Sequence, residues 1–281
     1  AANGTVAIGK SAAAAITSGE NNVAVGYQAL KTEDTADFNT AIGYQALTTA
    51  NAGDNTSMGI PADDGGNTAV GAFAGQKQTT GAWNTFIGAH AGRQNTTGIY
   101  NTFVGKAAGA YTTAGIGCTA LGANALSSSN AGGQMYGQTA IGAGALSSSA
   151  PGVAFGGGNT AVGFECAHAL TTGGYNVFVG HQAGQHTTVV SSSVVIGYKA
   201  GAQKMTTAAN GAVLVGYQAG TALTTGARNT FIGYQAGQAV STGDGNTVVG
   251  YEAGDALTTG EKHTLIGGKA GTALTTGGGD P

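Results

Sequence analysis

An apolar residue followed by glycine recurs sixteen times along this chain of 281 residues, and ten of the fifteen intervals between successive glycines of the pair are 17 residues long. A 17-residue period is too short for a repeat of paired helices, and it fits one coil of a parallel β-solenoid, in which coils stack about 4.8 Å apart. The pairs are Ile8-Gly9, Val25-Gly26, Ile42-Gly43, Met58-Gly59, Val70-Gly71, Ile87-Gly88, Val104-Gly105, Leu121-Gly122, Ile141-Gly142, Val162-Gly163, Val179-Gly180, Ile196-Gly197, Val215-Gly216, Ile232-Gly233, Val249-Gly250 and Ile266-Gly267.

Positions numbered from that glycine keep their character along the chain. Position −1 is Ile, Val, Leu or Met, position −3 is Thr or Val, and position +3 is Ala in all copies but one. The segment Asn-Thr-x-Ile-Gly alternates with a period of two and predicts a short strand that ends at a glycine bend. We expect a second strand near the following Tyr-Gln-Ala and a return turn at Thr-Thr-Gly. The predicted fold class is therefore all-β, a parallel β-solenoid of about sixteen short coils.

The alternation also predicts which side chains fill each coil. We expect position −1, the Ala at +3 and a later apolar position to face inward, the later position being Leu170, Leu223, Val240, Leu257 and Leu274. Position −2 then points outward although it is apolar in all copies but one, which predicts a stripe that contacts a partner. The alternative is that the faces are inverted and position −2 forms the core. The bulkiest members of this candidate interface stripe are Phe86, Phe103, Phe178, Leu214, Phe231 and Leu265.

Position −4 is Asn in ten copies. We predict a ladder in which each side-chain amide hydrogen-bonds the copies above and below and satisfies backbone groups of the turn. Because the same residue recurs in ten coils, a structural role is favoured over a catalytic or metal-binding one. The predicted ladder consists of Asn22, Asn39, Asn55, Asn67, Asn84, Asn101, Asn159, Asn176, Asn229 and Asn246.

Some copies carry a resemblance to known repeats. The segments Thr5-Val-Ala-Ile-Gly9 and Asn21-Asn-Val-Ala-Val-Gly26 resemble the head repeat of YadA-like trimeric autotransporter adhesins. The segments Asn39-Thr-Ala-Ile-Gly-Tyr-Gln-Ala-Leu47 and Asn229-Thr-Phe-Ile-Gly-Tyr-Gln-Ala-Gly237 are similar to repeats of phage tail-fibre proteins. The resemblance covers essentially the whole chain and implies a left-handed β-roll assembled as a parallel homotrimer. The chain departs from the adhesin pattern in its longer period and in Thr commonly replacing Val at −3.

Composition argues against several classes of function. Ten basic and thirteen acidic residues give a net charge of −3, which offers no electrostatic footprint for nucleic acid. No run of 18 apolar residues exists, so we expect no membrane insertion by a helix. Two cysteines cannot make a disulfide scaffold. The five histidines occupy unrelated positions of the repeat, and no Ser/His/Asp arrangement stands out. We therefore expect no enzyme, no cofactor and no metal site.

The predicted function is a non-enzymatic fibre protein, a rod segment of a trimeric phage tail fibre or surface adhesin. It would lie outside the cell or on a virion surface and attach to a cell-surface receptor or glycan. One alternative is an extracellular filament subunit that stacks head-to-tail through open solenoid ends. Ice binding is less favoured, because the repeated Thr pairs precede Gly and look like turns.

We expect one solenoid over 1–281, with irregular coils around 59–71, 122–163 and 197–216. The insertions in the middle carry Met135, Tyr136 and Phe155 as bulky groups for contact with a partner. Asp54, Asp63 and Asp64 could hold Ca²⁺, although a solvated turn is the simpler interpretation.

Overall fold

The structure is a computed structural model that describes residues 4–32, 35–49, 66–127, 135–147 and 157–277. Regular structure in these residues is all-β apart from one 3₁₀ turn. The chain forms two compact units, and among the described residues the first ends at Gln138 and the second begins at Thr139. Each unit is a parallel β-solenoid in which paired strands mostly follow one another at 17 residues.

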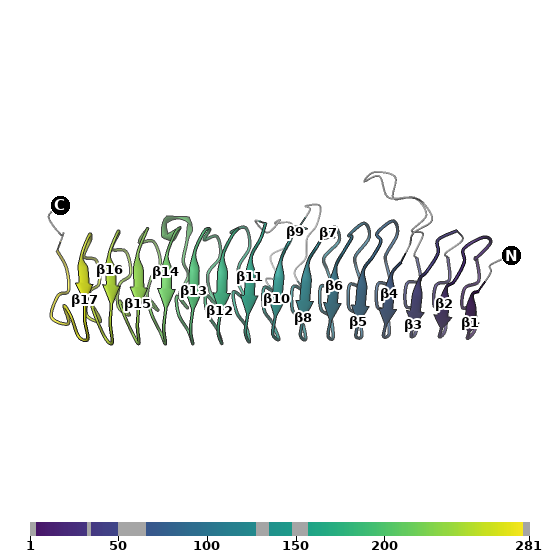
Figure 1. Ribbon diagram of the computed structural model, residues 1–281, viewed down its shortest axis with the longest axis horizontal. Helices are drawn as coiled ribbons and strands as arrows, with labels where there is room; N and C mark the ends of the chain where they lie inside the picture. Colours follow the sequence, from purple (N-terminus) through teal and green to yellow (C-terminus); the bar gives the residue numbers. More distant parts are fainter. Residues whose placement is uncertain (1–3, 33–34, 50–65, 128–134, 148–156, 278–281) are drawn as a thin grey trace. The chain divides into compact units, whose positions relative to one another are not determined.

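Each coil contributes one three-residue strand to the main sheet, and the strands of a unit lie side by side in chain order (Figure 1). Every strand of the main sheet runs from position −3 to position −1, which confirms the strand prediction in the described coils. The first unit contains β1 (Val6–Ile8), β2 (Val23–Val25), β3 (Thr40–Ile42), β4 (Thr68–Val70), β5 (Thr85–Ile87), β6 (Thr102–Val104) and β8 (Thr119–Leu121). The second unit contains β10 (Thr139–Ile141), β11 (Thr160–Val162), β12 (Val177–Val179), β13 (Val194–Ile196), β14 (Val213–Val215), β15 (Thr230–Ile232), β16 (Thr247–Val249) and β17 (Thr264–Ile266).

The ladder keeps its register where the repeat length changes. β3 pairs directly with β4, and Thr40 lies opposite Thr68. The Met58-Gly59 copy falls between these two strands in the sequence and lies outside the described residues. Because β3 and β4 are direct neighbours, no strand separates them. The described residues contribute 15 strands to the main sheet, one fewer than the sixteen copies of the apolar–glycine pair.

The second strand expected at Tyr-Gln-Ala is wrong for the described coils, which have a turn there. In the coil of β15, Gln235 (φ 52°) and Gly237 (φ 56°) adopt the left-handed conformation, which breaks the pleat of a strand. The segment still stacks on its neighbours. The Gln235 N–H donates to the carbonyl of Tyr217 at 2.8 Å, and the Gly237 N–H donates to the carbonyl of Ala253 at 2.9 Å. Hydrogen bonds between coils thus continue without extended backbone.

The glycine that follows each strand is required by two constraints at once. Gly88 has a φ of +129°, a conformation that L side chains rarely adopt. A Cβ at this position would also lie 2.6 Å from the carbonyl oxygen of Gly105 in the next coil. Since the same bend is stacked coil upon coil, a side chain has no space in this column.

The prediction of which strand face points inward is wrong. A three-residue strand turns its middle side chain to one side and its two flanking side chains to the other. The middle residue, at position −2, shares the interior with the Ala at +3, whereas the Thr or Val at −3 is partly or largely exposed. The candidate interface stripe is therefore core: Phe86, Phe103, Phe178, Leu214 and Phe231 are fully buried, and Leu265 is partly buried.

The other two inward predictions are confirmed. The Ala at +3 is fully buried in nearly every described coil, as at Ala236, and Cys166 is fully buried at the same position. The later apolar position is also core: Leu170, Leu223, Val240 and Leu257 are fully buried, and Leu274 is partly exposed.

Core volume couples position −2 to position +4. In all eight described coils in which −2 is Phe, Leu or Val, position +4 is Gly, and in four of the seven in which −2 is Ala, position +4 is Leu. The coil of β15 shows the cause, since a Cβ on Gly237 would lie 2.8 Å from the ring of Phe231. A closely packed interior has space for one bulky side chain, placed either on the strand or on the turn.

Two regions depart from the regular coil. Between β13 and β14, which pair directly, the longer interval contains the 3₁₀ turn η3 (Thr207–Ala209). In the first unit, β7 (Gly115–Ile116) and β9 (Met135–Tyr136) form a separate two-stranded parallel sheet. Met135 is fully buried there and Tyr136 is exposed, whereas Phe155 and the three Asp residues considered for Ca²⁺ lie outside the described residues.

Candidate functional site

The asparagines at position −4 form a hydrogen-bonded column inside the coil. The Oδ1 of Asn229 accepts from the backbone N–H of Asn246 at 2.9 Å and from its Nδ2 at 3.1 Å. The Nδ2 of Asn246 also donates to the carbonyl of Gly260 at 2.8 Å, which ties the strand to the return turn. The same pattern links Asn84 with Asn101 and Asn159 with Asn176. Asn55 lies outside the described residues.

Other residues at this position reproduce part of the pattern. In the last described coil, His263 stands at position −4 in place of an asparagine. Its backbone N–H donates to Oδ1 of Asn246 at 3.0 Å, and its Nε2 lies 3.0 Å from the carbonyl oxygen of Gly277. The spacing of 14 residues to that carbonyl is the same as for Asn246 and Gly260, so this histidine has a structural contact.

Outward from the strand, position −1 forms a column that we call the outer apolar column. All of its described members are partly or largely exposed, because the flanking side chains of the strand point away from the core. Exposure is highest at Ile8 and Ile266, in the terminal strands β1 and β17. The most exposed members are Ile8, Ile42, Ile87, Leu121, Ile232 and Ile266.

Past the glycine bend, position +1 carries stacked aromatic rings. In the second unit, Tyr198, Tyr217, Tyr234 and Tyr251 stack with centroids 5.0–5.3 Å apart. His181 continues this stack, 5.4 Å from Tyr198. The tyrosines are exposed over about 40–50% of their surface, and their ring faces contact each other.

Positions +2 and +5 form polar columns on the turn segment. In the first unit, Nε2 of Gln45 donates to Oε1 of Gln28 at 2.8 Å, and Nε2 of Gln76 donates to Oε1 of Gln45 at 3.0 Å. Nε of Arg93 continues the series by donating to Oε1 of Gln76 at 3.1 Å. The next coil has Ala107 at +2 and Ala110 at +5, so the series stops.

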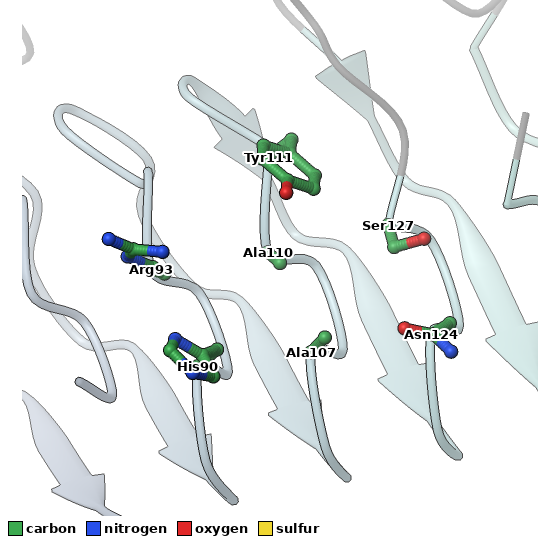
Figure 2. A pocket seen from close by; sticks show the side chains of 7 residues that line it. All are labelled: His90, Arg93, Ala107, Ala110, Tyr111, Asn124 and Ser127. Atoms are coloured by element: carbon green, nitrogen blue, oxygen red, sulfur yellow. The ribbon is translucent and has the colours of Figure 1, made fainter. Parts of the chain in front are cut away.

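A hollow of about 230 Å³ opens where the polar columns stop. Figure 2 shows two rows of side chains around it, with Tyr111 beside Ala110. One row holds position +5 of three successive coils, and the other holds position +2 of the same coils. The lining residues are His90, Arg93, Ala107, Ala110, Tyr111, Asn124 and Ser127. Sequence reasoning missed this site, although the two alanines in columns that elsewhere hold glutamine are visible in the sequence.

No protein-family model, curated protein or solved structure matches the chain.

No group of three or more His, Cys, Asp or Glu side chains suited to a metal ion occurs in the described ranges. Both cysteines are free thiols in the interior, and burial raises the pKa of Cys166 to about 12. Nδ1 of His168 lies 2.7 Å from Oγ of Ser147, without an acidic partner among the contacts described for that pair. Across the same ranges, no helix has the length and apolar character needed to cross a membrane.

Proposed function

We propose that this chain is a non-enzymatic structural and attachment segment of a trimeric fibre, either a phage tail fibre or a bacterial surface adhesin, at a virion surface or outside a cell. The observation that carries the proposal is the outer apolar column. A repeated row of Ile, Val and Leu side chains that is partly exposed to water favours a surface covered by a partner.

The partner that this column fits best is a second copy of the same chain. Two identical solenoids have the same distance between coils, so their side chains stay in register over many coils, whereas an unrelated surface would drift out of register. Parallel packing of like columns also brings Thr at −3 and Ile at −1 of each copy together. A trimer with left-handed coils is the arrangement that the resemblance to adhesin and tail-fibre repeats implies.

The oligomeric state tests this proposal. Sedimentation equilibrium of the chain should give a discrete mass of three times 27.1 kDa. The double variant Ile232→Ser, Val249→Ser should dissociate or weaken the trimer, because two members of the outer apolar column become polar. Gln235→Asn, on the polar column of the same coil, is the matched control and should leave the mass unchanged.

Other masses would contradict the proposal. A stable monomer at micromolar concentration would exclude assembly through the outer apolar column. Polymers of unlimited length would favour the head-to-tail filament instead.

Ice binding is a second candidate, and one specific observation favours it. The outward face of ten of the fifteen main-sheet strands presents Thr at −3 beside Ile, Val or Leu at −1, as at Thr230 and Ile232, which are partly exposed and exposed. Thermal hysteresis with faceted ice crystals would support this function, and freezing without hysteresis would exclude it.

A further inference from the structure

The hollow in the first unit lies on the turn segment, apart from the outer apolar column. None of its lining residues belongs to a strand. It exists because Ala107 and Ala110 leave out the two side chains that would continue the polar columns. Gln76, Gln185 and Gln238 occupy position +5 in other coils, so the backbone accepts a glutamine there. The hollow therefore arises where both positions of one coil carry only a methyl group beside coils with larger side chains.

One polar group at this hollow, the Arg93 guanidinium, is available for a ligand, and an unpaired imidazole nitrogen lies buried beside it. The Arg93 guanidinium is held by the Nε–Gln76 hydrogen bond and by the ring of Phe73, whose centroid lies 5.6 Å from Cζ. Its terminal nitrogens make no hydrogen bond in the part of the chain that the structure describes. Nδ1 of His90 is buried and likewise has no hydrogen-bond partner among the described residues. An unpaired buried nitrogen is costly unless a ligand or water satisfies it.

The electrostatics of this region favour an anion. No Asp or Glu occurs between Asp64 and Glu165, and the charged residues of that stretch are Lys77, Arg93 and Lys106. The pKa of His90 lies below its ordinary value because of burial first, and then because the positive charges of Arg93 and Lys106 oppose its protonation. Burial is thus the main reason that this imidazole resists protonation, and the positive charges of Arg93 and Lys106 act in the same direction.

We propose that this hollow binds one acidic monosaccharide unit of a surface glycan, with the sugar carboxylate at Arg93. This deepens the attachment role proposed above and rests on it. A guanidinium presents a planar pair of N–H donors that matches a carboxylate. On the far side of the two alanines, Asn124 and Ser127 offer an amide and a hydroxyl to sugar hydroxyl groups.

The dimensions agree with a single sugar ring. Arg93 and Ser127 stand two coils apart, roughly 10 Å along the stack at about 4.8 Å per coil. The volume of about 230 Å³ is below the range of pockets for drug-sized ligands, which begins near 300 Å³. Tyr111 is half exposed beside the hollow and supplies an apolar wall for one face of the ring.

Binding by the full chain can be measured by ligand-observed NMR titration at physiological salt. The probes are glucuronic acid, N-acetylneuraminic acid, glucose and glucose 6-phosphate. We expect at least one of the two sugar acids to bind with a millimolar dissociation constant and glucose to bind at least tenfold more weakly. Arg93→Gln should weaken binding of the sugar acid at least tenfold, and Ala110→Gln, which fills the hollow, should abolish it. Lys199→Gln removes a cation from position +2 in the second unit and should leave binding unchanged.

Several outcomes would overturn the proposal. These are the absence of binding by both sugar acids, equal binding of glucose, retention of binding in Ala110→Gln, or an equal loss in Lys199→Gln. If glucose 6-phosphate bound more tightly than either sugar acid, the group recognised by Arg93 would be a phosphate ester, and the proposed carboxylate ligand would be wrong. Sedimentation of the same samples separates the two proposals: a trimer that binds no acid contradicts only this site, and a monomer that binds one contradicts only the fibre assembly.

Discussion

Segments 39–47 and 229–237 have the same sequence at seven of nine positions, and they fill their coils in opposite ways. The first has Ala41 on the strand and Leu47 on the turn, and the second has Phe231 on the strand and Gly237 on the turn. Ala41, Leu47 and Phe231 are fully buried. The bulky side chain has moved from one side of the coil interior to the other. What the fold maintains is the filled volume of the core, by either of two residues.

The exposure of the outward side chains is nearly the same in the two coils. Ile42 and Ile232 are both 39% exposed, and Tyr44 and Tyr234 are 47% and 42% exposed. The two kinds of coil therefore present the same surface to a partner. Assembly through the outer apolar column can run across both kinds, while stability is decided by the interior.

The largest effect is expected when the core of one kind of coil is emptied. Phe231→Ala leaves both −2 and +4 small and should cost about 3–5 kcal/mol of unfolding free energy. Gly237→Leu alone overfills the coil against the Phe231 ring. The double variant Phe231→Ala, Gly237→Leu converts the coil to the kind seen at 39–47 and should recover most of the loss. Guanidinium denaturation of the three variants measures this cycle.

The same cycle can contradict the comparison. Leu30, Leu47, Leu126 and Leu146 adopt a positive φ at position +4, so leucine is compatible with that backbone. A double variant as unstable as Phe231→Ala would mean that the two positions do not share one volume.

The next largest effect is expected in the asparagine column, which both kinds of coil share. Asn229→Ala removes an acceptor 2.9 Å from the Asn246 N–H and a donor 2.7 Å from the Gly243 carbonyl, at about 1–3 kcal/mol for each buried group left unpaired. The contacts of Asn39, to Asn67 at 3.2 Å and Asp37 at 3.3 Å, are longer, so Asn39→Ala should cost less. Thermal melting of both variants compares them. A larger loss at Asn39 would show that core filling, not hydrogen bonding, sets the cost.

A smaller loss is expected from overfilling the alanine column. Ala236→Leu adds three carbons to a fully buried position and should cost about 1–3 kcal/mol. Ala46→Leu tests the same position in the other kind of coil and should cost a similar amount, because position +3 faces the interior in both. An unchanged melting temperature in either variant would contradict the inward position of that alanine.

The sequence predicted the strand and the β-solenoid because its glycine bend and its period are repeated many times. It led to the wrong prediction of which strand face points into the core, because a three-residue strand of Thr, Phe and Ile has apolar groups on both faces. The decisive signal was present in the pairing of Phe231 with Gly237 and of Ala41 with Leu47, which single columns do not reveal. The hollow at Arg93 was missed for the opposite reason: its only sequence signal is two small residues, Ala107 and Ala110, and small residues form no recognisable binding motif.

The smallest effect is expected in the exposed aromatic stack. Tyr234 stacks in parallel on Tyr217 and Tyr251, whereas Tyr44 stacks on Tyr27 and meets Phe73 edge-on. Each aromatic pair is worth about 0.5–1.5 kcal/mol beyond its buried area, so Tyr234→Ser and Tyr44→Ser should each lower the unfolding free energy by an amount of that order. Because neither ring reaches the interior, the two losses should agree although the coils are filled differently. A much greater loss of unfolding free energy for Tyr44→Ser in the denaturation curves would contradict this. It would mean that core filling affects the stability contributed by the outward side chains.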